Sequence, residues 1–384
     1  MPGLLPDVDP DGLLEYSVVY TDRALNHMSA RFQDVMCDIS SNLKRVYHAH
    51  SAVIVPGSGT FGMEAVARQF AEQRHCLVIR NGWFSYRWSQ ILEMGGIPAE
   101  TDVLKARRLD GNDPTSPFAP APIEEVIETI HDRRPDIVFM PHVETSAGII
   151  LPDDYIRRVA GAIHEVGGLL VLDCIASGTL WVDMHDLGVD VLVSAPQKGW
   201  SASPCCGMVM LSGRAREAIE QTTSSSFACD LKKWLSIMET YEAGGHAYHA
   251  TLPTDGLVKL RDVMVEIDVH GLERVKHQQQ ALGDAVRKLL ADYGYRSVAA
   301  PGFEAPGVVV SYTEDGKIVG KFAEAGVQVA GGVPLMCDEG ENFQTFRIGL
   351  FGLEKLQDRQ RSLANLKAAL DHLAASQTAP ASKA

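Results

Sequence analysis

Short apolar runs alternate with longer helix-periodic stretches between about residues 30 and 220 of this chain. The apolar runs are rich in Val, Ile and Leu and are typical of buried strands, at 50–55, 76–79, 136–140, 168–172 and 189–193. Between them, apolar residues recur every three or four positions, as in helices, at 29–46, 63–73, 84–94, 123–131 and 153–166. This alternation predicts an α/β fold in which helices cover both faces of a mostly parallel sheet.

The pattern changes after a further apolar run at 207–211. Residues 212–245 are polar and helical in pattern, and 256–293 carry a long helical periodicity that breaks near Gly271. Two weak strands at 307–312 and 344–348 and a final helix at 353–374 follow. We therefore predict three parts: an N-terminal segment at 1–28, a large domain at 29–255 and a small C-terminal α+β domain at 256–384.

The charge balance excludes some partners. The chain has 35 Lys and Arg against 49 Asp and Glu, a net charge of −14, which argues against binding to nucleic acid or to an anionic membrane surface. No apolar run is long enough to cross a bilayer, and residues 1–10 lack the basic start and apolar core of a signal peptide. The seven cysteines are scattered and show no disulfide or zinc spacing. We expect a cytoplasmic protein without a metal site.

The first motif with chemical meaning is the run GSGTFG at 57–62, between the strand at 50–55 and the next helix. A turn of small residues at a helix N-terminus exposes backbone N–H groups, and Ser58 and Thr60 add hydroxyls, so the run predicts a phosphate site. The run also fits the G-x-G-x-x-G pattern of dinucleotide sites, which need an acidic residue about 20 positions further on. Arg80 stands near that place instead, so an NADP site with Arg80 on the 2′-phosphate remains an alternative.

Two titratable residues follow strands of the same sheet. Asp173 ends the strand at 168–172, and Lys198 follows the strand at 189–193. Because the carboxyl ends of parallel strands meet at one edge, both are expected at the crevice where such sheets bind ligands. Pyridoxal 5′-phosphate (PLP) requires a phosphate site, a carboxylate that keeps the pyridine nitrogen protonated and a lysine that carries the aldehyde. The combination favours PLP over a nicotinamide.

These motifs and their order resemble the class V aminotransferases of the fold-type I PLP-dependent enzymes, in particular the alanine–glyoxylate and serine–pyruvate aminotransferase branch. The resemblance runs from about residue 29 to residue 352 and implies a seven-stranded type of sheet between helices. It implies Lys198 and Asp173 as catalytic residues. The cofactor site that it implies comprises Ser58, Gly59, Thr60, Phe84, Thr145, Asp173, Gln197, Lys198, Tyr248 and Thr251.

Further roles follow from the same resemblance. In the run NGWFSYR at 81–87, Phe84 corresponds to the ring that stacks on the pyridine, with Trp83 as the alternative, and Ser85 replaces a family glycine. Thr145, in the run HVETSAG at 142–148, corresponds to the residue that bonds the cofactor's phenolic oxygen. Gln197 directly precedes the lysine and has a phosphate or supporting role.

The resemblance also implies a homodimer with shared active sites. Tyr248 and Thr251 correspond to residues that reach the phosphate of the partner subunit, and Arg347 corresponds to the clamp for the substrate α-carboxylate. The family's G-P-G-P segment, which lines the substrate pocket, is absent, and residues 16–29 stand in its place. Tyr20 and His27 are candidate contacts there, and the amino donor therefore stays open.

The sequence thus predicts a PLP-dependent aminotransferase. It would move an amino group from a small amino acid to a 2-oxo acid such as glyoxylate or pyruvate, by ping-pong transamination through a Schiff base at Lys198. A PLP-dependent lyase of the cysteine desulfurase type is an alternative, with Cys337 as the loop cysteine ahead of Arg347. An NADP-linked oxidoreductase and a catalytically inactive binding module remain as weaker alternatives.

Overall fold

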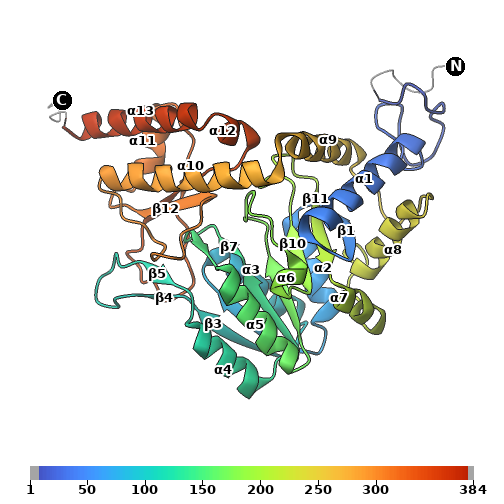
Figure 1. Ribbon diagram of the computed structural model, residues 1–384, viewed down its shortest axis with the longest axis horizontal. Coiled ribbons are helices and arrows are strands. Elements are labelled where there is room, and N and C mark those ends of the chain that lie inside the picture. Colours follow the sequence, from blue (N-terminus) through green and yellow to red (C-terminus); the bar gives the residue numbers. More distant parts are fainter. Residues whose placement is uncertain (1–7, 379–384) are drawn as a thin grey trace.

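In the computed structural model, which describes residues 8–378, seven strands form the central sheet in the order β1-β11-β10-β9-β6-β2-β3 (Figure 1). Residues 1–7 of the predicted N-terminal segment lie outside the described residues. Strand β11 pairs antiparallel with both neighbours, and the other pairs are parallel, which confirms the prediction of a mostly parallel sheet. The strands are β1 (Ser51–Pro56), β2 (His75–Arg80), β3 (Glu100–Lys105), β6 (Ile137–Pro141), β9 (Leu169–Asp173), β10 (Val191–Ser194) and β11 (Cys206–Leu211).

Helices cover both faces of this sheet, since β6, β10 and β11 are buried along their whole length. The main helices that pack on strands are α1 (Ala30–Tyr47), α2 (Gly59–Phe70), α3 (Trp83–Gly95), α5 (Asp153–Glu165) and α8 (Leu231–Glu242), and α4 (Ile123–Arg133) packs on α5. The short elements are β4 (Arg107–Arg108), β5 (Phe118–Ala119), β7 (Val143–Glu144), β8 (Ile149–Ile150), α6 (Met184–Leu187), α7 (Gly213–Ala218) and the 3₁₀ turn η1 (Ile219–Gln221).

The C-terminal part forms a separate antiparallel sheet in the order β12-β14-β13, at the upper left of Figure 1. Its strands are β12 (Val308–Tyr312), β13 (Ala330–Gly331) and β14 (Thr345–Gly349). Its helices are α10 (Leu272–Asp292), α11 (Ile318–Glu324), α12 (Leu353–Gln357) and α13 (Arg359–Thr378). Before them, α9 (Thr254–His270) packs against α1. No helix in the described part combines the length and apolarity needed to cross a bilayer.

A second apolar cluster joins the two sheets. It combines Phe118 and Ile149 of the predicted large domain with Val298 and Val308 of the predicted small domain. The Phe118 amide donates to the Val298 carbonyl at 2.7 Å, so backbone hydrogen bonding crosses the same boundary. The small domain is therefore fixed against the edge of the main sheet at which β6 and β9 end.

Candidate active site

Five strands of the main sheet bring side chains to one cavity of about 200 Å³. Strands β1, β2, β6, β9 and β10 run in the same direction, so their carboxyl ends meet at one edge. Eight of the predicted site residues line the cavity: Ser58, Gly59, Thr60, Phe84, Thr145, Asp173, Gln197 and Lys198. The sequence-predicted acid and lysine thus share one cavity.

The N-terminus of α2 forms the anion-binding end of the cavity. Gly57 has φ +122°, and a Cβ there would lie 2.8 Å from the Phe61 ring, so the turn requires glycine. Within the described residues, the backbone amides of Gly59 and Thr60 donate to no protein acceptor. The Thr60 hydroxyl accepts a hydrogen bond from Arg87 Nη1 at 3.0 Å, which adds a cation. Free amides, a helix N-terminus and a guanidinium suit a phosphate.

Asp173 lies at the end of β9 and is only 6% exposed. Its carboxylate accepts a hydrogen bond from the Ile175 amide at 2.9 Å. The pKa of Asp173 is raised to about 7, mainly by burial and in part by the nearby Glu144 carboxylate, whereas the Ile175 hydrogen bond, Arg87 and Lys198 oppose the shift. A buried carboxylate with few hydrogen bonds and cations around it is stabilised by a cationic partner, such as a protonated ring nitrogen.

Lys198 is partly buried in the loop that follows β10. Burial lowers the pKa of its amine, the Arg347 and Arg87 cations lower it further, and Asp173 opposes them. An amine with a lowered pKa is unprotonated more of the time, which a nucleophile or general base requires. The adjacent Gln197 has a buried Oε1 without a hydrogen-bond partner among the described residues.

Glu144 fixes the first turn of α3, where Phe84 and Trp83 lie. Its fully buried carboxylate accepts from the Phe84 amide at 3.2 Å and from the Ser85 amide and hydroxyl at 2.8 and 2.7 Å. The amide and hydroxyl of Ser146 also donate to it, at 3.0 and 2.7 Å. Phe84 lines the cavity, whereas Trp83 does not and instead contacts Tyr86, with ring centroids 5.7 Å apart. The geometry therefore places Phe84, not Trp83, at the site.

Arg347, on β14, reaches the Phe84 ring from the small domain. Its guanidinium carbon lies 5.7 Å from the Phe84 ring centroid, and its Nε donates to the Gly331 carbonyl at 2.9 Å. Burial lowers its pKa from the usual value, with Glu144 opposing, and arginine remains a cation at such shifts. Arg347 is thus a positive group adjacent to the cavity, as a carboxylate clamp requires.

The structure does not bring Tyr248 and Thr251 to this cavity. Their hydroxyls hydrogen-bond to each other at 3.1 Å, and Tyr248 is 52% exposed. Tyr248 and Tyr20 both lie next to His27, each with its ring centroid 5.6 Å from that of His27. Tyr20 and His27 of the N-terminal segment therefore lie beside the predicted partner-reaching pair.

The residues on which the NADP and desulfurase alternatives depend, Arg80 and Cys337, make hydrogen bonds outside the cavity. Arg80 is 8% exposed and donates to the Met336 carbonyl at 3.2 Å and the Ser89 hydroxyl at 2.9 Å, so it is not free to bind a 2′-phosphate. Cys337 is buried, its thiol donates to the Arg80 carbonyl at 3.5 Å, and burial raises its pKa to about 12. A protonated thiol outside the cavity does not suit sulfur transfer.

Sequence reasoning did not assign Arg87 and Glu144 to the site. Arg87 follows Phe84 by three residues on α3, and its guanidinium carbon lies 5.2 Å from the Phe84 ring centroid. Residues three apart in a helix lie on the same face, so this spacing could have placed Arg87 beside Phe84 at the site. Glu144 lies within the run HVETSAG, directly before Thr145, but only the contacts of its carboxylate show its role.

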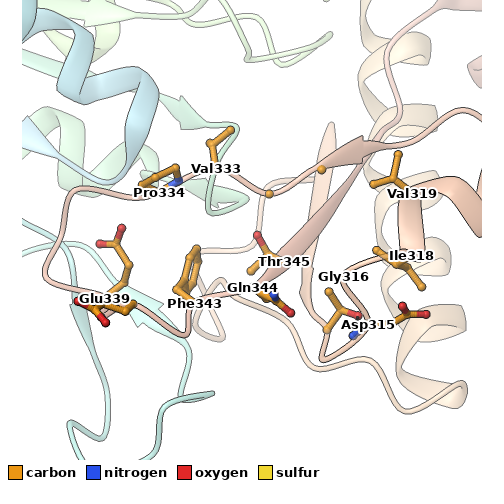
Figure 2. Close-up of a pocket in the computed structure, with 15 residues that line it drawn as sticks. Asp315, Gly316, Ile318, Val319, Val333, Pro334, Glu339, Phe343, Gln344 and Thr345 are labelled. Atoms are coloured by element: carbon orange, nitrogen blue, oxygen red, sulfur yellow. Dashed lines mark hydrogen bonds between the residues drawn. The ribbon is translucent and has the colours of Figure 1, made fainter.

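A larger cavity of about 430 Å³ lies in the C-terminal part, lined by residues from 313–319 and 331–345, and Figure 2 shows side chains of both segments around it. The carboxylates of Asp315 and Glu339 at its wall are already hydrogen-bonded, to Lys321 and to backbone amides respectively. None of the predicted site residues lines it. The smaller cavity at the main sheet is therefore the candidate active site.

The residues of that cavity fit PLP. The α2 amides with Arg87 suit its phosphate, Asp173 suits its ring nitrogen and Lys198 suits its aldehyde. The buried Oε1 of Gln197, which has no partner among residues 8–378, can accept a hydrogen bond from a bound ligand. Phe84 lines the same cavity and offers an aromatic face to the cofactor.

Comparisons with known proteins agree with this geometry. The family described as Aminotransferase class-V matches residues 13–332. An alanine–glyoxylate aminotransferase from Oryctolagus cuniculus is 25% identical over 366 residues, covering 92% of this chain and 88% of that protein. A 2-aminoethylphosphonate–pyruvate transaminase from Paraburkholderia phymatum is 30% identical over 342 residues, covering 86% and 84%. The solved alanine–glyoxylate aminotransferase from Nostoc sp. shares the fold, with a TM-score of 0.77 at 23% identity, covering 91% and 89%.

Proposed function

The chain belongs to the class V aminotransferase family and is an aminotransferase, and we propose that it transfers the amino group of a small amino acid to a 2-oxo acid with PLP at Lys198. The family and its fold-type I structural neighbours are PLP-dependent. The observation that carries the proposal is that Asp173 and Lys198 line one cavity together with the amino end of α2. A cytoplasmic location and a homodimer with shared sites stay predictions.

When bound, PLP supplies an electron sink that stabilises negative charge at the α-carbon of the amino acid. The Asp173 carboxylate would hold a proton on the ring nitrogen, because a nearby carboxylate favours the cationic form. Lys198 Nζ, with its lowered pKa, would remove the α-proton and return it. Arg347 would bind the substrate carboxylate, and Phe84 would orient the ring.

The proposed acceptor is glyoxylate or pyruvate, and the donor is a small amino acid such as alanine or serine. The names of the relatives support these classes: an alanine–glyoxylate aminotransferase and a 2-aminoethylphosphonate–pyruvate transaminase. The second relative adds 2-aminoethylphosphonate as a candidate donor. The guanidinium of Arg347 lies near the Phe84 ring and offers positive charge for either an α-carboxylate or a phosphonate.

A panel of donors tests this proposal. Purified protein loaded with PLP is mixed with alanine, serine or 2-aminoethylphosphonate without an acceptor, and the visible absorbance of the cofactor is followed. We expect one donor to bleach the band and glyoxylate or pyruvate to restore it, with parallel double-reciprocal lines in steady state. Retention of the visible band by a Lys198→Ala variant, or intersecting lines, would contradict the proposal.

The desulfurase alternative lacks support from the site. Gln197 occupies the position before the lysine where that group carries histidine, and Cys337 donates its thiol proton to backbone carbonyls away from the cavity. Release of sulfide from cysteine by the purified protein would restore this alternative.

A further inference from the structure

Phe351 follows β14 by two residues and lies against the amine of Lys198. The distance from Lys198 Nζ to the Phe351 ring centroid is 5.0 Å. An ammonium group over an aromatic face is attracted by the ring quadrupole, and more strongly where water is excluded. Phe351 is not among the described residues that line the cavity, so its ring reaches the site only through the lysine.

The ring has a fixed position. A Cβ at Gly307 would lie 3.1 Å from Phe351 Cε1, so the ring packs closely on the backbone there, and it also contacts the second apolar cluster. Just beyond it, the Leu353 amide donates to Ser201 Oγ at 2.9 Å, and the Ser201 amide donates to the Lys198 carbonyl at 3.1 Å. The small-domain segment is thus connected to the lysine loop through both side chains and backbone.

The same segment carries Arg347, four residues before Phe351. The charged groups that face the Lys198 amine are Arg347 from β14, Arg87 from α3 and Asp173 from β9. Two of these three are cations that repel an ammonium group. Phe351 is the partner that attracts the ammonium without adding a charge to the cavity.

We propose that Phe351 is a positioning residue for Lys198: its ring holds the amine in place for proton transfer and ties the lysine to the segment that carries the Arg347 clamp. The inference rests on the proposed function, in which Lys198 moves the α-proton. The proposal means that a residue of the C-terminal part positions the catalytic lysine at the edge of the main sheet.

The first test measures the lysine itself. Full-length protein freed of PLP is treated with an amine-acetylating reagent over a range of pH, and modification of Lys198 is followed by mass spectrometry. Phe351→Leu keeps an apolar side chain but removes the ring, so the pH midpoint of labelling should fall by roughly 0.3 to 0.7 units. Phe351→Tyr, which keeps a ring, should retain the wild-type midpoint. Phe303→Leu is the matched control, because Phe303 packs on the same apolar cluster without contacting the lysine.

The second test uses the loaded enzyme. Phe351→Leu should lower kcat about three- to thirtyfold through misplacement of the amine, with KM for the amino acid within about twofold, since Arg347 is unchanged. Phe351→Tyr and Phe303→Leu should keep the wild-type kcat. Where thermal unfolding shows that the Leu variant does not fold, Phe351→Met gives the same comparison.

The outcomes separate this inference from the proposed function. A wild-type midpoint and kcat in Phe351→Leu would overturn the positioning role while the wild-type enzyme still transaminates. A wild-type protein that binds no PLP and converts no amino acid would instead overturn the proposed function, and the positioning role with it. If Phe303→Leu changes the labelling midpoint and kcat as much as Phe351→Leu does, Phe351 contributes only to packing.

Discussion

The carboxylate of Glu144 accepts hydrogen bonds from both the backbone amide and the hydroxyl of Ser85, at 2.8 and 2.7 Å. The Ser85 hydroxyl in turn accepts from the amides of Asn81 and Gly82, at 2.9 and 3.1 Å. A serine at this position, where the resembling family has glycine, therefore ties the start of α3 to a buried charge. The position of Phe84, between Ser85 and Trp83, depends on this network.

Glu144→Gln should destabilise the protein and weaken binding of PLP. The amide nitrogen of glutamine cannot accept the hydrogen bonds that one carboxylate oxygen now receives, so the free energy of unfolding should fall by about 2 to 4 kcal/mol. Urea unfolding measures the loss, and a fluorescence titration with PLP measures the affinity. Ser85→Ala removes only the hydroxyl and should cost about 1 to 2 kcal/mol. Unchanged stability and affinity in both variants would show that the network does not hold Phe84.

Asp173 should make the PLP-free protein less stable as the pH rises. Burial raises its pKa from 3.8 to about 7, so the folded chain binds more protons than the unfolded chain between these values. Stability from this group is fully present below the unfolded pKa and is lost as the pH rises through the folded pKa. Between pH 5 and 8 the wild type should lose about 2 to 3 kcal/mol relative to Asp173→Asn. Urea unfolding of both proteins at several pH values measures this, and parallel curves would refute it.

Mixing two inactive variants should restore activity if the sites are shared. In a dimer of Lys198→Ala with Tyr248→Ala, one site carries both defects and the other carries neither. Random reassociation gives half mixed dimers, so about one quarter of the wild-type sites should return. The assay compares each variant alone with the pair after mild denaturation and refolding together. Recovery no greater than the sum of the separate variants would mean that Tyr248 serves its own chain or no site.

Cys337→Ala should leave transamination within about twofold of wild type, because the thiol is buried, protonated and outside the cavity. The free energy of unfolding should fall by roughly 1 kcal/mol for the lost side-chain packing. The measurements are kcat/KM with the best amino donor and urea unfolding. A large selective loss of turnover with cysteine as substrate would instead point to sulfur chemistry.

Much of the fold could be predicted from the sequence because the buried strands are apolar on both faces and therefore appear as continuous apolar runs. Strand β3 was not predicted, since it pairs only with β2 at the edge of the sheet and its residues Glu100, Thr101 and Asp102 are polar. The antiparallel direction of β11 could not be predicted either, because an apolar run of six residues does not show whether the strand runs parallel or antiparallel to its neighbours.

The site was predictable where it depends on strand ends. Asp173 ends β9 and Lys198 lies in the loop just after β10, so chain order alone places them at one edge of the sheet. Glu144 and Phe351 act through contacts between elements far apart in sequence, as in the contact between Phe351 and Lys198. Such contacts follow from packing, which periodicity does not encode.

The two halves of the site come from different parts of the architecture. The residues that suit PLP lie at the carboxyl edge of the main sheet before residue 200, whereas Arg347 enters on β14 of the C-terminal part. Variation around residues 331–347 can therefore change which amine donor is accepted while the vitamin-binding half stays intact. An engineer seeking a transaminase with a new substrate range should randomise that segment and leave the sheet edge untouched.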